Sequence, residues 1–218
     1  MRTLYNQIAN QNGERLAALS DGVFAFAMTL LALDIRLPAM EAIHSEHDLW
    51  SGLMTLGPKL LMYLMSFLTL GIFWNGQQTQ LNHFERVDRD LSWIHLAFLA
   101  TITLMPFSTQ LLADFIAYRT ALFAYWLNIF LPGALLYISW SYAIRHGLVS
   151  EGTPAEVRAA ICRRVVIAQS LYATGALLCF ISTRWSIAAI LLVQLNYAVA
   201  PRLLWQARNR DQGTGNSH

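Results

Sequence analysis

Charged residues are what this sequence has least of. Asp, Glu, Lys and Arg make up only 13% of its 218 residues, about half of the roughly 25% found in ordinary soluble domains. Hydrophobic residues make up 56% and are gathered into long runs. The formal net charge is only +2, so the composition gives no reason to expect a nucleic acid as a partner. The shortage of charge excludes an ordinary soluble surface and predicts a protein that faces lipid.

Cysteine and the common catalytic motifs are also scarce. Cys162 and Cys179 lie 17 residues apart in one apolar segment, which matches no metal-ligand spacing and is too far along one helix for a disulfide. The sequence contains no intramembrane zinc motif, nucleophile elbow or P-loop. It also lacks a TVGYG-like segment. These absences argue against an enzyme, a cofactor or a carbonyl-lined potassium filter.

Six apolar segments approach the roughly 20 residues that a helix needs to cross about 30 Å of hydrocarbon. They cover residues 16–37, 52–74, 91–113, 120–143, 161–183 and 185–205. The first is full length and follows a polar stretch, so we expect it to be a span rather than a cleaved signal peptide. The sequence predicts an all-α integral membrane protein, with one six-helix transmembrane domain over 1–205 and a polar, disordered tail over 206–218.

Arginines are distributed unevenly between the connections, and this predicts the orientation. With both termini in the cytoplasm, the inner segments contain eleven arginines and the outer loops only three. The inner ones are Arg2, Arg15, Arg86, Arg89, Arg145, Arg158, Arg163, Arg164, Arg202, Arg208 and Arg210; the outer ones are Arg36, Arg119 and Arg184. The first outer loop is acidic, and we interpret its His44 and His47 as part of a solvated loop, not as a metal site.

Asp21 is a charged residue inside the first predicted span, where charge is costly. One interpretation places it at the headgroups, capping or snorkelling; the other buries it in a hydrogen-bond network with neighbouring helices. At about 100° per residue, Asp21 points about 140° away from Phe26, and Ser20 about 120° away on the other side. Gly22, Leu30 and Leu33 lie within about 40° of Phe26, and Thr29 within about 60°. The helix therefore has an apolar stripe and a separate polar face. Such a stripe is most often lipid-facing or packed in a core.

The first span also resembles a known family. Its residues Arg15-Leu-Ala-Ala-Leu-Ser20-Asp21 are similar to the motif R-x-x-x-F-S-D of the transmembrane protein 175 family of potassium channels. Phe73-Trp74, Asp90-Leu-Ser-Trp93 and the segment 104–111 resemble the family's second and third spans. The likeness covers the first half of the chain well and the second half only in general character.

This resemblance implies a homotetramer in the lipid bilayer of a bacterial inner membrane, in which the first helices line a pore for potassium and other monovalent cations. It implies a hydrophobic gate in place of a filter. Carried over by position, the gate layers are Phe26, Leu30 and Leu33, and the threonine layer linked to cation preference is Thr29.

The resemblance also implies that Arg15, Ser20 and Asp21 hold the first helix against spans two and three, with Trp74 and His95 as candidate partners. Three positions depart from the family pattern. Leu19 replaces the motif phenylalanine, Phe26 replaces an isoleucine at the narrowest layer, and Gln77-Gln78 replace a His-His pair. Four phenylalanines make a bulkier plug, or offer ring faces to a cation.

The leading hypothesis is thus a potassium-preferring cation channel gated by dewetting of an apolar constriction. The alternative is a proton- or cation-coupled secondary transporter with Asp21 as the titrating group. Such transporters often contain inverted repeats and interrupted helices in matching positions, and the sequence shows neither.

Overall fold

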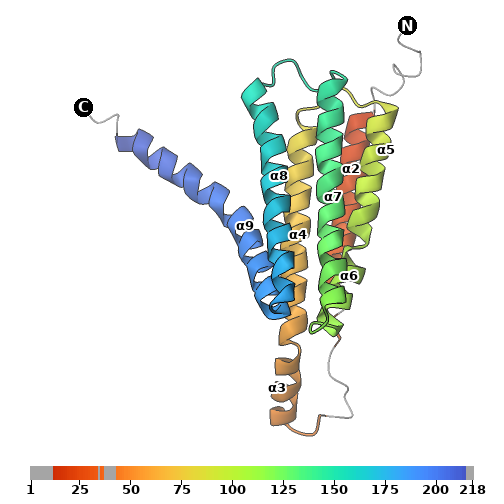
Figure 1. Cartoon of the computed structure of the whole chain (residues 1–218), viewed down its shortest axis with the longest axis vertical. Coiled ribbons are helices and arrows are strands. Elements are labelled where there is room, and N and C mark those ends of the chain that lie inside the picture. The colour runs from red at the N-terminus through yellow and green to blue at the C-terminus, as the bar shows by residue number, and fades with distance from the viewer. Residues whose placement is uncertain (1–11, 34, 37–42, 215–218) are drawn as a thin grey trace.

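The protein folds as a bundle of antiparallel helices (Figure 1). The structure is a computed structural model that describes residues 12–33, 35–36 and 43–214. Its helices are α2 (Asn12–Leu33), α3 (Glu46–Thr55), α4 (Gly57–Leu81), α5 (Arg89–Thr103), α6 (Met105–Asp114), α7 (Arg119–Arg145), α8 (Ala155–Leu177), the 3-10 turn η3 (Leu178–Phe180) and α9 (Thr183–Thr214). The start of α2 and the end of α9 lie toward the same end of the bundle (Figure 1).

Four segments of the described chain are long and apolar enough to cross a membrane. They are Gly13–Leu33, Gly57–Leu81, Arg89–Asp114 and Arg119–Arg145. α8 is also 23 residues long, but its first half carries Arg158, Arg163 and Arg164, which lower its hydropathy. The prediction of an all-helical protein with membrane-spanning helices is confirmed.

The second span is shifted toward the C-terminus from the predicted 52–74, because α4 covers Gly57–Leu81. Pro58 stands in the first turn of α4, where its missing N–H costs nothing. The last turns of α4 were not predicted, since they are polar. They are helical because Gln77 and Gln80 find partners on α2 and α7.

The acidic outer loop of the prediction contains a short helix, α3. Ser45 is its N-cap and accepts a hydrogen bond from the Asp48 backbone N–H at 3.2 Å. The Asp48 carboxylate in turn accepts from the His44 backbone N–H at 3.2 Å and from the Ser45 hydroxyl at 2.8 Å. The polar residues here therefore build a helix start. Within the described residues no group of three or more His, Cys, Asp and Glu is placed to hold a metal ion; Glu41 lies outside them.

The third span, predicted as one helix over 91–113, is two helices that meet at Leu104. Pro106 lies in the first turn of α6. It has no N–H to donate to the Ile102 carbonyl, and its ring disfavours a continuous helix at this point. The direction of the span is kept, but its regular hydrogen bonding is interrupted.

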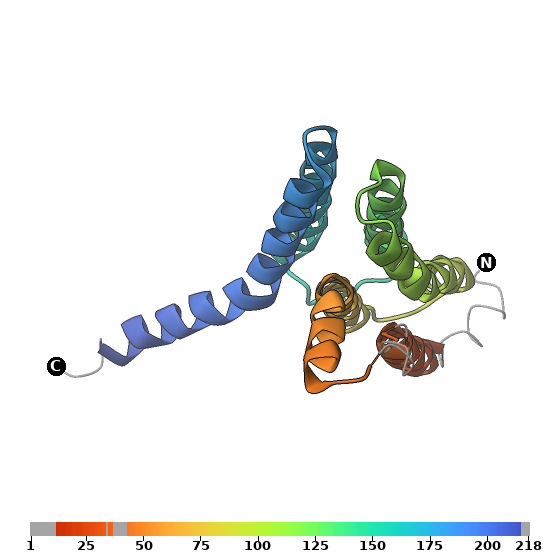
Figure 2. The same cartoon turned by 90° about the horizontal axis from the view of Figure 1, so that it is seen from below.

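The last two helices form a hairpin. The Ser186 hydroxyl of α9 donates to the Gly175 carbonyl of α8 at 2.5 Å, and α9 then leans away from the bundle (Figures 1 and 2). α9 continues to Thr214; the polar, disordered tail over 206–218 stays a prediction. The segment lacks apolar periodicity, but Gln206, Ala207 and Arg208 are good helix formers.

The close approach of α8 to α9 generates a test at Gly175. A Cβ added there would lie 3.2 Å from Ile190 Cγ1 and 3.6 Å from the Ile190 backbone nitrogen. Gly175→Val is expected to overpack this contact and to cost about 1–3 kcal/mol, seen as a lower Tm of the detergent-solubilised protein. Gly71→Val on α4, where a Cβ meets nothing within 4 Å, is the control. An unchanged Tm for Gly175→Val would contradict this contact.

Candidate functional site

One face of α2 packs into the subunit. Its buried residues recur every three or four positions, as expected for one side of a helix, and are Leu16, Ser20, Phe24, Ala27 and Leu31. This face lies against α4, α5 and α6. The Phe24 ring lies 6.0 Å from the Phe98 ring of α5. Apolar packing therefore fixes which way the other face of α2 points.

The opposite face of α2 is uncovered. Phe26 is 64% exposed and Leu33 74% exposed; Thr29 is exposed and Leu30 half-buried. Figure 2 shows α2 at the edge of the bundle, with α4 on one side and α5 on the other. The Thr29 hydroxyl donates to the Phe26 carbonyl at 2.8 Å. Its proton is thereby used within the helix, and its oxygen lone pairs remain free to accept from, or coordinate, a ligand.

Ser20 is the buried contact between α2 and α4. Gln77 Nε2 donates to Ser20 Oγ at 2.8 Å, and Ser20 Oγ donates to the Leu16 carbonyl at 2.7 Å. Ser20 and Gln77 are both fully buried. Because hydrocarbon offers no water to replace a lost partner, this pair fixes the rotation of α2 about its own axis.

Asp21 makes a second contact to α4, next to the buried Ser20–Gln77 contact. Trp74 Nε1 and Gln78 Nε2 both donate to Asp21 Oδ1 at 2.8 Å. Asp21 itself is exposed; it is tied into a hydrogen-bond network with α4, but it is not buried. Gln77 and Gln78 contact the first helix, although the sequence marked them only as departures from a family pattern; the signal was two neighbouring amides at the end of an apolar helix.

His95 and Arg15 do not join this network. His95 is buried on α5, and its Nδ1 lies 3.3 Å from the Leu91 carbonyl and 3.4 Å from Ser139 Oγ of α7. It therefore links α5 to α7 and is not a partner of Asp21, because its side of α5 faces α7. Arg15 is exposed, and it makes no side-chain hydrogen bond or ion pair with the residues that the structure describes.

A second polar network lies deeper in the bundle. Gln194 Nε2 of α9 donates to Thr69 Oγ1 of α4 at 2.7 Å, and Thr109 Oγ1 of α6 donates to Ser66 Oγ of α4 at 2.7 Å. Ser66 Oγ donates to Tyr125 Oη of α7 at 3.2 Å. These hydrogen bonds join α4, α6, α7 and α9 near the middle of α4. Asn196, another polar residue of α9, is exposed.

Residues 15–106 match the family described as endosomal/lysosomal potassium channel TMEM175. A potassium channel of Chamaesiphon minutus is 29% identical over 189 residues, covering 85% of this chain and 93% of that protein. The crystal structure of a lysosomal potassium-selective channel TMEM175 homolog from Chamaesiphon minutus has the same fold, with a TM-score of 0.75, 26% identity and coverage of 87% of this chain and 98% of that one. This chain is similar to TMEM175 proteins in sequence over residues 15–106 and in fold over most of its length.

TMEM175 proteins are ion channels and not enzymes, according to the names that these relatives carry. The family match contains α2, α4 and α5, and with them both contacts that anchor the first helix. A potassium channel of Streptomyces collinus is 37% identical over 107 residues, and this chain spans about half of its length, 50%. The human relative, named an endosomal/lysosomal proton channel, is 31% identical over 102 residues, 44% of this chain and 20% of that protein.

Ser20 offers a direct test of the buried contact. Ser20→Ala removes the acceptor of Gln77 Nε2 and leaves a buried donor unpaired, which costs about 1–3 kcal/mol. We expect a lower Tm in detergent. The control is Ser170→Ala on α8, because Ser170 is exposed and its replacement stays within about 0.5 kcal/mol. Equal melting of the two variants would show that the Ser20 contact does not hold α2.

Proposed function

We propose that this chain is a potassium-preferring cation channel, a homotetramer in which the first helix of each subunit lines a central pore. The observation that carries the proposal is the asymmetry of α2. One face is anchored to α4 by Ser20 and Asp21, while the opposite face leaves Phe26 and Leu33 uncovered. The bacterial relatives named potassium channels agree with it.

The spacing of the uncovered residues suits a gate without a carbonyl filter. Phe26, Leu30 and Leu33 follow one another at four and three residues, so their layers lie about 6 and about 4.5 Å apart at 1.5 Å per residue. Apolar rings around an axis block ions by excluding water, and conduction requires that they widen or wet. Thr29 lies between the first two layers and brings a hydroxyl oxygen to the same face.

In this proposal Arg15, Ser20 and Asp21 stabilise the packing of α2 within its own subunit and do not bind the permeating ion. The Asp21 carboxylate oxygen that faces α4 already accepts two hydrogen bonds, from Trp74 and Gln78. Their role is to hold α2 at a constant rotation, so that the gate residues stay on the axis. Arg15, which is exposed near the start of α2, is assigned to this motif by family resemblance.

The proposed topology has six spans in a single domain over residues 1–205, with α8 and α9 as the fifth and sixth. The connections α4–α5 and α7–α8 lie at the same end of the bundle as the start of α2 (Figure 1). Arg86, Arg89, Arg145 and Arg158 belong to this end, whereas Arg119 and Arg184 stand at the opposite one. Excess arginine marks the cytoplasmic side, which in a bacterial inner membrane places both termini inside.

Potassium flux into liposomes that carry the purified protein tests the pore. We expect flux above that of empty liposomes, and a severalfold increase for Phe26→Ala because the variant removes the bulkiest ring. Phe107→Ala on α6 is the matched control, since Phe107 is 65% exposed on another helix. Flux no higher than in empty liposomes for both wild type and Phe26→Ala would contradict a pore along α2.

The same liposomes distinguish the alternative, a coupled transporter that uses Asp21. Because vertebrate relatives are named proton channels, proton flux is measured beside potassium flux. A channel gives non-saturating currents that persist in Asp21→Asn if the protein folds. Saturable, pH-coupled uptake that Asp21→Asn abolishes would favour the transporter.

The mass of the detergent-solubilised protein tests the shared axis. We expect a particle of four chains of 24.6 kDa each by light scattering corrected for bound detergent. Leu33→Lys adds four charges to the proposed axis and is expected to weaken the tetramer. A monomer in mild detergent for the wild type would rule out a pore made of four first helices.

A further inference from the structure

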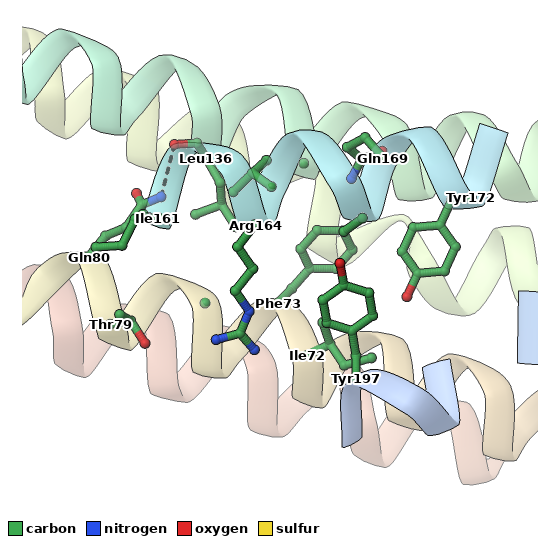
Figure 3. Close-up of a pocket in the computed structure, with 14 residues that line it drawn as sticks. Ile72, Phe73, Thr79, Gln80, Leu136, Ile161, Arg164, Gln169, Tyr172 and Tyr197 are labelled. Atoms are coloured by element: carbon green, nitrogen blue, oxygen red, sulfur yellow. Dashed lines mark hydrogen bonds between the residues drawn. The ribbon is translucent and has the colours of Figure 1, made fainter. Parts of the chain in front are cut away.

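A pocket opens on the side of α4 that faces away from α2. It lies between α4, α7, α8 and α9, and its empty space is about 640 Å³ when the open solvent at its mouth is included. Figure 3 shows its walls: Phe73 and Ile72 come from α4, Leu136 from α7 and Tyr197 from α9. The lining is mostly apolar, and no acidic residue belongs to it.

One cation stands in this pocket. Arg164 reaches from α8 toward α4 and ends between Thr79 and Tyr197 (Figure 3). Its guanidinium carbon lies 5.9 Å from the centre of the Tyr197 ring, a cation–π distance. Within the described chain the ion pair found is Lys59–Asp114, so Arg164 has no carboxylate partner among these residues. Its five N–H donors are available to an anion from outside.

The deeper part of the pocket contains buried polar atoms without partners. Tyr172 is only 2% exposed, and its hydroxyl has no hydrogen bond. The same is true of Gln169 Oε1. A buried hydroxyl without a partner is costly. An occupant that brings an acceptor oxygen below its anionic group would remove this cost at Tyr172.

The depth of the pocket matches one leaflet of a bilayer. Along α8 it extends from Ile161 to Tyr172, which is about 17 Å at 1.5 Å per residue, or close to half of the roughly 30 Å hydrocarbon core. Arg164 lies toward the end of the bundle that carries Arg158 and Arg163. Basic pockets between membrane helices on this side suit anionic headgroups.

We propose that this pocket is a binding site for one anionic phospholipid of the arginine-rich leaflet. The phosphate lies on the Arg164 guanidinium, and one acyl chain fills the apolar space between α4 and α8. The proposal requires a membrane-spanning bundle but not ion conduction, so it stands apart from the pore.

Native mass spectrometry of the full chain in detergent tests the site. Phosphatidylglycerol is compared with phosphatidylcholine of the same acyl chains. We expect the wild type to retain phosphatidylglycerol, and Arg164→Gln to bind it about tenfold more weakly, because a charge-assisted contact worth about 1.4 kcal/mol is lost. Arg163→Gln is the matched control, since this neighbour does not line the pocket, and its binding is expected within about twofold of the wild type.

A second variant tests the seat of the acyl chain. Ala168→Trp fills the pocket from α8 and is expected to abolish retention of both lipids while the oligomeric state is unchanged. Glycerol 3-phosphate, which has the phosphate but no acyl chain, is expected not to displace phosphatidylglycerol at equal concentration.

Four outcomes would overturn the proposal. They are equal retention of the two lipids by the wild type, equal losses in Arg163→Gln and Arg164→Gln, displacement by glycerol 3-phosphate, and a change of oligomeric state in Ala168→Trp. The last would instead identify the pocket as a contact between copies of this chain.

Discussion

The hydrogen bond from Gln77 to Ser20 is the interaction on which the arrangement of this protein depends. It joins two fully buried side chains from neighbouring helices at 2.8 Å, in surroundings where no water can substitute for either. The hydrogen bonds from Trp74 and Gln78 to Asp21 lie beside it and further restrict the rotation of α2. Once the rotation of α2 is fixed in this way, the face that holds Phe26 can point only outward from the subunit.

α4 is the central helix because it serves two sides at once. Over residues 73–80, Trp74, Gln77 and Gln78 face α2, while Phe73, Thr79 and Gln80 belong to the pocket beneath α8. Gln77 and Gln78 donate to α2, whereas Gln80 donates to the Leu136 carbonyl of α7, so the amides of this segment bind different neighbours. A small rotation of α4 would therefore disturb the anchor of α2 and the walls of the pocket together.

The two faces of α2 follow from the sequence, because helical geometry alone separates Phe26 from Ser20 and Asp21. The breaks in the helices do not. Pro58 and Pro106 lie in the first turns of helices, whereas Pro132 lies inside an uninterrupted α7. Only the packing of the surrounding helices decides whether a helix starts at a proline or continues through it. The partner of His95 was also beyond reach, since it depends on α7 offering Ser139. The pocket at Arg164 brings α4 against α7, α8 and α9, which lie far from it in the sequence, and no local sequence pattern predicts it.

The ion pair between Lys59 and Asp114 gives the two ends of the bundle different properties. α6 is joined to α4 through the buried Thr109–Ser66 bond and to α7 through the buried Asn128–Ser108 bond. At its tip, the ion pair among the described residues is Lys59–Asp114, at 3.0 Å with both side chains more than a third exposed. Dissolved ions screen an exposed pair and leave buried bonds untouched. A high salt concentration on that side therefore weakens the contact between the tip of α6 and α4, while the buried hydrogen bonds in the middle of α6 are retained. The rigidity of this end of the bundle thus varies with the ionic strength of the medium.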